Sequence, residues 1–202
     1  MNREAIRSKF GADYSANDST YRMGLDVRFA NHLADRLKGR VVLETCAGGG
    51  FTTIALARQA ERVFSVEIDS ERLFDAKRNA ALAGVRGNIT FIRADIFDVR
   101  IDSLDRRIDA ALVDPDWADT EIDHVYRFED STTLPPSDWI LDYLADFTEN
   151  ITLVQPPLVD EREYESLPPH ELEKLYMSGK HELTCLHFGN LLRNVGKTEF
   201  RV

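Results

Sequence analysis

A short apolar segment followed by three consecutive glycines constrains this chain more than any other feature. Val41-Val42-Leu43 predicts a strand, Glu44 stands at its end, and Gly48-Gly49-Gly50 leads into a predicted helix over 52–59. Because glycine has no Cβ, such a turn bends sharply and lets a ligand lie directly on the backbone. The pattern is typical of a nucleoside site at the first strand-to-helix turn of an α/β sheet.

Two ligand classes use a glycine turn in this position, and the spacing distinguishes them. A dinucleotide site reads G-x-G-x-x-G, but here Gly48 and Gly50 are followed by Thr53 where the third glycine belongs. The alternative, acid-x-x-x-G-x-G, is met in full by Glu44, Gly48 and Gly50. A carboxylate in this position suits the amino end of a zwitterionic, sulfonium-bearing ligand that has no pyrophosphate. A glycine turn without any ligand is the remaining alternative.

This second pattern resembles motif I of the class I S-adenosylmethionine-dependent methyltransferases. The resemblance implies S-adenosyl-L-methionine as the cofactor and S-adenosyl-L-homocysteine as the product. It also implies that Glu44, Cys46, Gly48 and Gly50 belong to the cofactor site.

Strands and helices alternate through residue 154, which predicts a mostly parallel sheet with helices on both faces. The expected fold is a single Rossmann-like class I methyltransferase domain over 27–202 with a seven-stranded sheet. An arm over 1–26 precedes it. The expected strands are 41–43, 63–69, 89–92, 108–113, 151–154, 182–188 and 197–202, and the expected helices are 30–37, 52–59, 70–83, 137–147 and 168–177.

Acidic residues end the first four predicted strands, and they are Glu44, Glu67, Asp95 and Asp114. Because ligands of such sheets bind at the carboxyl ends of the strands, these side chains are expected along one edge. Glu67 is the candidate for the ribose hydroxyls, Asp95 for the adenine amino group, and Ile96 for the face of the adenine ring. Asp69, by contrast, is interpreted as the cap of the following helix.

A second motif, Asp114-Pro115-Asp116-Trp117, directly follows the fourth strand. It resembles motif IV of methyltransferases that act on exocyclic or amide nitrogens. Asp114 and the carbonyl of Pro115 would accept the two hydrogens of an amine and so align its lone pair, while Trp117 would stack on the base. Asp114 is counted with the cofactor site as well. Asp116 replaces the usual second proline and is assigned to the substrate, as an acceptor of a proton from the nucleophile or of a base edge. The alternative is that both acids merely terminate the strand and Trp117 belongs to the core.

Composition limits the remaining possibilities. The net charge of −10 argues against a broad polyanion-binding surface, although residues 1–40 carry eight Lys and Arg against five Asp and Glu. The arm is therefore the expected nucleic-acid contact, with a solvated tail as the alternative. Cys46 and Cys185 form no disulfide framework, the five histidines are scattered, and no metal site is predicted. With a polar start and no long apolar run, a cytoplasmic protein without membrane contact is expected.

The chain also resembles the RNA cap guanine-N2 methyltransferases, the trimethylguanosine synthase family, over roughly residues 20–192. The segments that carry this resemblance are the two motifs, 21–26, 134–139 and 187–191. In that family the tryptophan of motif IV stacks on the 7-methylguanine base, which corresponds to Trp117. Three functions stay open: methylation of a guanine-type exocyclic amine in RNA or a nucleotide, methylation of a small-molecule or protein amine, and cofactor binding without catalysis.

Overall fold

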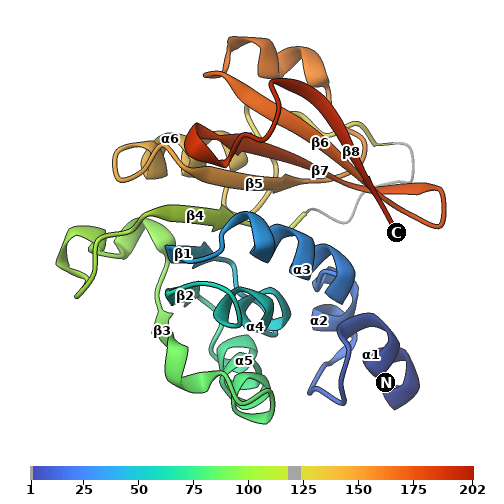
Figure 1. Ribbon diagram of the computed structural model, residues 1–202, viewed down its shortest axis with the longest axis vertical. Helices are drawn as coiled ribbons and strands as arrows, with labels where there is room; N and C mark the ends of the chain where they lie inside the picture. Colours follow the sequence, from blue (N-terminus) through green and yellow to red (C-terminus); the bar gives the residue numbers. More distant parts are fainter. Residues whose placement is uncertain (1, 118–123) are drawn as a thin grey trace. The chain divides into compact units, whose positions relative to one another are not determined.

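The computed structural model describes residues 2–117 and 124–202 and divides into two compact units, Met1–Asp109 and Ala110–Val202 (Figure 1). Eight strands lie within the described residues, one more than the sequence predicts. The first unit holds three of them, and the second unit holds five.

The first unit contains three parallel strands in the order β3-β2-β1. Its strands are β1 (Val41–Thr45), β2 (Arg62–Glu67) and β3 (Ile89–Arg93), and its helices are α1 (Arg3–Phe10), α2 (Asp18–Met23), α3 (Val27–Arg36), α4 (Phe51–Ala57) and α5 (Ser70–Leu82), with short 3-10 helices at Arg86–Asn88, Ile96–Asp98 and Ile101–Ser103. The strands and helices predicted over 30–93 are thereby confirmed. Asp69 caps α5 as predicted, because its side chain accepts hydrogen bonds from the backbone N–H groups of Glu71 and Arg72, both at 2.8 Å.

The N-terminal arm is helical and packs into the first unit. Asn2 and Asn17 cap α1 and α2, which are too short for a clear apolar period in the sequence. Phe10 stacks on Phe51 at the start of α4, with ring centroids 3.6 Å apart and planes 4° apart. Since Phe10 is only 4% exposed, the solvated tail considered above is wrong for this segment.

Asn79 of α5 joins this arm to the glycine turn. Its side-chain amide accepts a hydrogen bond from Ser15 N at 2.7 Å, and it donates to Ser15 O and Gly49 O, each at 2.9 Å. The side chain is fully buried. The buried side of α5 is made by Leu73, Ala76 and Ala80 together with Asn79.

The second unit contains five strands in the order β4-β5-β7-β6-β8. They are β4 (Ala110–Val113), β5 (Ile151–Gln155), β6 (His170–Met177), β7 (Lys180–Phe188) and β8 (Gly196–Arg201), with the helix α6 (Ser137–Ala145) and 3-10 helices at Glu161–Ser166 and Gly189–Leu191. The pairs β4–β5 and β6–β8 are parallel, whereas β7 runs antiparallel to both β5 and β6.

The helix predicted over 168–177 is wrong, because this segment is strand β6 and accounts for the eighth strand. Its Leu172 and Leu175 have helical spacing, but β6 lies between β7 and β8 and forms backbone ladders with both. Two glutamates on one face of β6 are buried and partnered by distant groups. Glu171 accepts hydrogen bonds from Arg193 N and Thr198 Oγ1, at 2.8 and 2.7 Å.

Phe10→Ala should lower the free energy of unfolding by about 3 kcal/mol, because it removes a buried aromatic ring and leaves a cavity against Phe51. Urea-induced unfolding measures this change. Leu82→Ala, at a position 62% exposed on α5, is the control and should change stability by less than about 0.5 kcal/mol. Equal effects of the two substitutions would contradict the packed position of the arm.

Candidate active site

The glycine turn between β1 and α4 is closed on one side and open on the other. Gly48 and Gly50 have φ angles of +52° and +78°, and Cys46 also has a positive φ of +59°. A Cβ at Gly50 would lie 2.8 Å from the Cα and the Cβ of Ala76 in α5, so only glycine fits there. A Cβ at Gly48 would meet nothing nearer than the carbonyl oxygen of Cys46 at 4.0 Å. The space beside Gly48 therefore leaves room for a ligand against the backbone.

Glu67, the last residue of β2, holds this turn in place. One carboxylate oxygen accepts a hydrogen bond from Gly48 N at 2.7 Å, and the other accepts from Asp69 N at 2.9 Å. The side chain is 3% exposed. Because each carboxylate oxygen has two lone pairs, both oxygens retain an acceptor site that is suited to ribose hydroxyls.

Glu44 lies inside the unit beneath the turn. Thr53 Oγ1 of α4 donates a hydrogen bond to it at 2.5 Å, and Thr53 Oγ1 lies 3.3 Å from Ser65 Oγ of β2. Burial raises the pKa of Glu44 to about 7, hydrogen bonds from Thr53 and Ser65 oppose this shift, and the charge of Glu67 adds to it. Glu44 therefore ties β1 to α4, and its service to the amino end of a cofactor stays a prediction.

The segment after β3 places the predicted adenine residues at the same edge as Glu67, since β2 and β3 are parallel and Glu67 pairs with Arg93. Asp95 is exposed and accepts a hydrogen bond from Phe97 N at 3.0 Å, whereas Ile96 is buried. Ile68 directly follows Glu67 and is 61% exposed, and it was not among the predicted site residues.

In the second unit, the segment Asp114–Trp117 leaves β4 as predicted. Asp114 is half-buried and Pro115 is buried. Trp117 is half-buried, and its Nε1 is buried without a hydrogen-bond partner among the described residues. A buried N–H donor without a hydrogen-bond acceptor is unusual in a folded protein and calls for an explanation. The six residues that follow, 118–123, lie outside the described residues, and so does that part of the predicted acidic loop.

Asp116 is fixed by a short backbone bridge. Its N–H donates to Leu134 O and its carbonyl accepts from Leu134 N, both at 2.9 Å. Buried polar side chains hold the turn that carries Leu134: Gln155 Nε2 donates to Ser137 Oγ at 2.8 Å, and Ser137 Oγ lies 2.8 Å from Thr133 Oγ1. This polar chain, which was not predicted from the sequence, keeps the motif in register with the start of α6.

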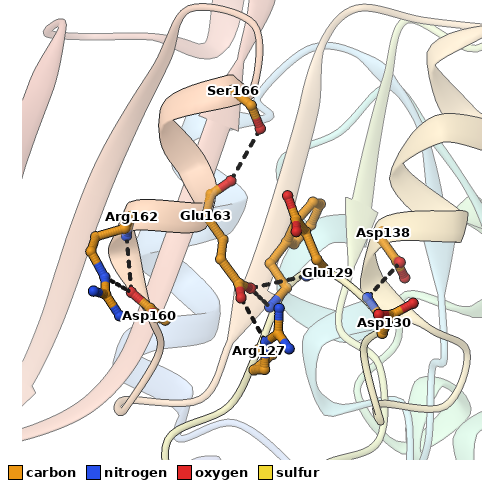
Figure 2. A network of polar contacts seen from close by, with 9 residues as sticks. Arg127, Glu129, Asp130, Asp138, Asp160, Arg162, Glu163 and Ser166 are labelled. Atoms are coloured by element: carbon orange, nitrogen blue, oxygen red, sulfur yellow. Dashed lines mark hydrogen bonds and ion pairs between the residues drawn. The ribbon is translucent and has the colours of Figure 1, made fainter.

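Glu163 anchors the chain where it returns after this motif (Figure 2). Its carboxylate accepts hydrogen bonds from Arg127 Nε at 2.7 Å, from Phe128 N at 2.6 Å and from Glu129 N at 3.0 Å. These bonds hold the pKa of Glu163 below its usual range, although its desolvation opposes the shift and is the largest single effect. The backbone of 127–129 is thus tied to the 3-10 helix Glu161–Ser166.

Among the residues that the structure describes, no three His, Cys, Asp or Glu side chains gather as a metal site would require. Within the same residues, no helix is long and apolar enough to cross a membrane.

Comparison with solved structures identifies the fold. A proposed methyltransferase from Porphyromonas gingivalis W83 matches 95% of this chain with a TM-score of 0.77 at 16% identity, and this chain spans 48% of it. An RNA methyltransferase from Salinibacter ruber, solved with S-adenosyl-L-homocysteine, matches 86% of this chain and 92% of its own length with a TM-score of 0.53 at 17% identity. TrmK of M. capricolum, also solved with S-adenosyl-L-homocysteine, matches 83% of this chain and 69% of its own length with a TM-score of 0.57 at 12% identity. The fold is the Rossmann-like fold of class I methyltransferases, as predicted, and the methyl donor of that class is S-adenosyl-L-methionine.

The family follows from the sequence itself. Residues 39–156, more than half of the chain, match the family model of the RNA cap guanine-N2 methyltransferases. The chain belongs to this family. The match includes both the glycine turn and the segment Asp114–Trp117.

Gly50→Ala is expected to abolish most cofactor binding, because the new Cβ forces the turn away from Ala76. Calorimetric titration with S-adenosyl-L-homocysteine measures the affinity of the variant for the cofactor product. Gly39→Ala is the matched control: its φ is +70° but a Cβ there meets nothing within 4 Å. The control should lose about 1–2 kcal/mol of stability and keep its affinity. Similar affinity losses in both variants would contradict the assignment of the turn.

Glu44 should make the protein less stable as the pH rises from about 4.5 to about 7, because the folded state holds a proton that the unfolded state has released. Glu44→Gln removes this dependence, and at pH 8 it should exceed the wild type in free energy of unfolding by up to about 3 kcal/mol. Urea unfolding of both proteins at pH 5 and pH 8 tests this. If the free energy of unfolding changes by the same amount between pH 5 and pH 8 in both proteins, the burial argument for Glu44 is wrong.

Proposed function

We propose that this chain transfers a methyl group from S-adenosyl-L-methionine to an exocyclic amine, with guanine N2 of RNA or of a nucleotide as the acceptor. The observation that carries the proposal is the segment Asp114–Trp117 after β4, in a chain that belongs to the guanine-N2 family. This chain spans about half of the P. gingivalis protein, so the substrate is argued from its own residues.

The first unit supplies the groups for the cofactor. S-adenosyl-L-methionine brings an electrophilic methyl group on a sulfonium. The open side of the turn at Gly48 accommodates the ligand backbone, and Glu67 accepts the ribose hydroxyls with its free lone pairs. The remaining cofactor residues of this unit are Glu44, Cys46, Gly50, Asp95 and Ile96, and Ile68 joins them as an apolar contact to the adenine. Asp114 of the second unit is counted with the cofactor site as well.

The second unit supplies the groups for the acceptor. An aromatic exocyclic amine is a poor nucleophile, because its lone pair is delocalised into the ring. Asp114 and the carbonyl of Pro115 accept its two hydrogens and hold the lone pair toward the methyl group. Trp117 stacks on the base and fixes its plane, which is worth about 1–3 kcal/mol per base. Such alignment lowers the barrier without covalent chemistry by the protein.

Asp116 favours an active site over one that has lost catalysis. The family usually has a proline here, and its loss would free the backbone. However, the N–H of Asp116 donates to Leu134 O, a bond that a proline lacks the donor to form. The bridge to Leu134 thus replaces the stiffness of the ring. We assign the Asp116 carboxylate to the substrate site, where it would accept a hydrogen bond from a base edge or a proton from the nucleophile.

A second candidate is methylation of a small-molecule or protein amine. The net charge of −10 and the extra carboxylate of Asp116 favour it, because both disfavour a phosphate-rich substrate. The N-terminal segment counters this trend. Residues 1–40 carry eight Lys and Arg against five Asp and Glu, and the excess lies within 27–40 because the arm over 1–26 has four of each. The arm packs beside the glycine turn through Asn79. We assign it to nucleic-acid contact, in front of a methyltransferase domain over 27–202.

Transfer of a labelled methyl group from S-adenosyl-L-methionine tests the acceptor. The panel holds 7-methylguanosine nucleotides, total RNA and a metabolite extract. Label should enter a guanine amine, and Trp117→Ala should reduce the transfer at least about fivefold through lost stacking. Trp117→Phe, which keeps an aromatic face, should restore most of it.

Titration with S-adenosyl-L-homocysteine distinguishes a loss of cofactor binding from a loss of acceptor binding. Trp117→Ala should bind S-adenosyl-L-homocysteine with the affinity of the wild type. Label only in the metabolite fraction would overturn the guanine proposal and establish the second candidate. Cofactor binding without transfer to any member of the panel would contradict both the guanine proposal and methylation of a small-molecule amine.

A further inference from the structure

An acidic residue followed by an aromatic residue recurs three times along α6 and its C-terminal turn. The pairs are Asp138-Trp139, Asp142-Tyr143 and Asp146-Phe147. Because positions four residues apart lie on the same side of a helix, the acids form one row and the aromatics form a neighbouring row. The buried side of α6 is made instead by Ser137, Ile140, Leu141 and Leu144.

The aromatic row is accessible, and two of its three rings contact each other. Trp139 is 67% exposed, and Tyr143 and Phe147 are half-buried. The rings of Tyr143 and Phe147 contact each other edge to face, with centroids 5.3 Å apart. An exposed tryptophan at the end of such a row is unusual on a surface that contacts only water.

The acidic row carries uncompensated charge. From Phe128 to Glu149 the chain has no Lys or Arg, and it has six acids: Glu129, Asp130, Asp138, Asp142, Asp146 and Glu149. Asp138 is engaged locally, because it accepts a hydrogen bond from Asp130 N at 3.2 Å (Figure 2). Asp142 and Asp146 are exposed, and within the described residues neither forms an ion pair.

We propose that this face of α6 docks an arginine- or lysine-rich segment of a partner protein. A guanidinium or ammonium group gains both from a carboxylate and from the face of an aromatic ring, and this row offers the two side by side at every turn. The charge excludes nucleic acid as the preferred occupant, since its phosphates would face Asp142, Asp146 and Glu149. The proposal is independent of the methyl acceptor.

A labelled alanine-based helical peptide with arginine at every fourth position is the probe, and its binding to the full chain is followed by fluorescence anisotropy. We expect binding that weakens as salt is raised. Trp139→Ala should weaken it about fivefold or more, and the double variant Asp142→Asn with Asp146→Asn should do the same. Phe74→Ala with Asp75→Asn is the matched control, because Phe74 on α5 is also 67% exposed and is followed by an acid.

Tryptophan emission locates the peptide directly. Trp117→Phe leaves Trp139 as the sole tryptophan, and its emission should shift to shorter wavelength when the peptide binds. In Trp139→Phe, the emission of Trp117 should stay unchanged. The proposal is overturned if the peptide binds equally well to the α6 variants and the control. It is likewise overturned if a single-stranded RNA binds this face more tightly than the peptide, or if Trp139→Ala instead abolishes a self-association of the chain.

Discussion

The glycine turn between β1 and α4 depends on hydrogen bonds from side chains that lie far from it in the sequence. Glu67 binds Gly48 N from the next strand, and Asn79 binds Gly49 O from α5. Neither Gly48 nor Gly50 has a side chain that could pack, so these bonds supply the rigidity that a ligand-binding turn requires. The same Asn79 holds Ser15, which makes the arm part of this support rather than an appendage.

Buried carboxylates recur in both units, and each is satisfied in a different way. Glu44 is paired with the hydroxyl of Thr53, so its burial shifts the equilibrium toward the protonated form. Glu173 lies 3.0 Å from His187 Nε2, which balances its charge whenever the imidazole is protonated. Glu171 uses backbone N–H groups and a threonine hydroxyl instead. A carboxylate buried without such partners would cost several kcal/mol, so these contacts constrain the sheet registers.

The sequence predicted the fold class and the strand-end acids because both depend on local patterns. The apolar runs of β1 to β5 and the cap at Asp69 are readable within a few residues. Strand β6 was misread because Pro168-Pro169 and Gly179 are typical of a helix start and a helix end, while its true partners, β7 and β8, follow later in the chain. The polar chain from Gln155 to Ser137 and the burial of Asn79 also escaped prediction, since a buried polar residue has no signature apart from its partners.

The departure of Asp116 from the family pattern is best understood through its backbone rather than its charge. A proline restricts one φ angle, whereas the bridge to Leu134 restricts the positions of two segments relative to each other. The motif is thereby tied to the turn before α6, and Glu163 ties the returning chain at 127–129 to the same unit. Trp117 directly follows the bridge, and its indole N–H has no partner among the described residues. Under the function proposed here, the bridge would fix the backbone from which Trp117 reaches a planar acceptor, so the substitution of proline by aspartate does not by itself argue against catalysis.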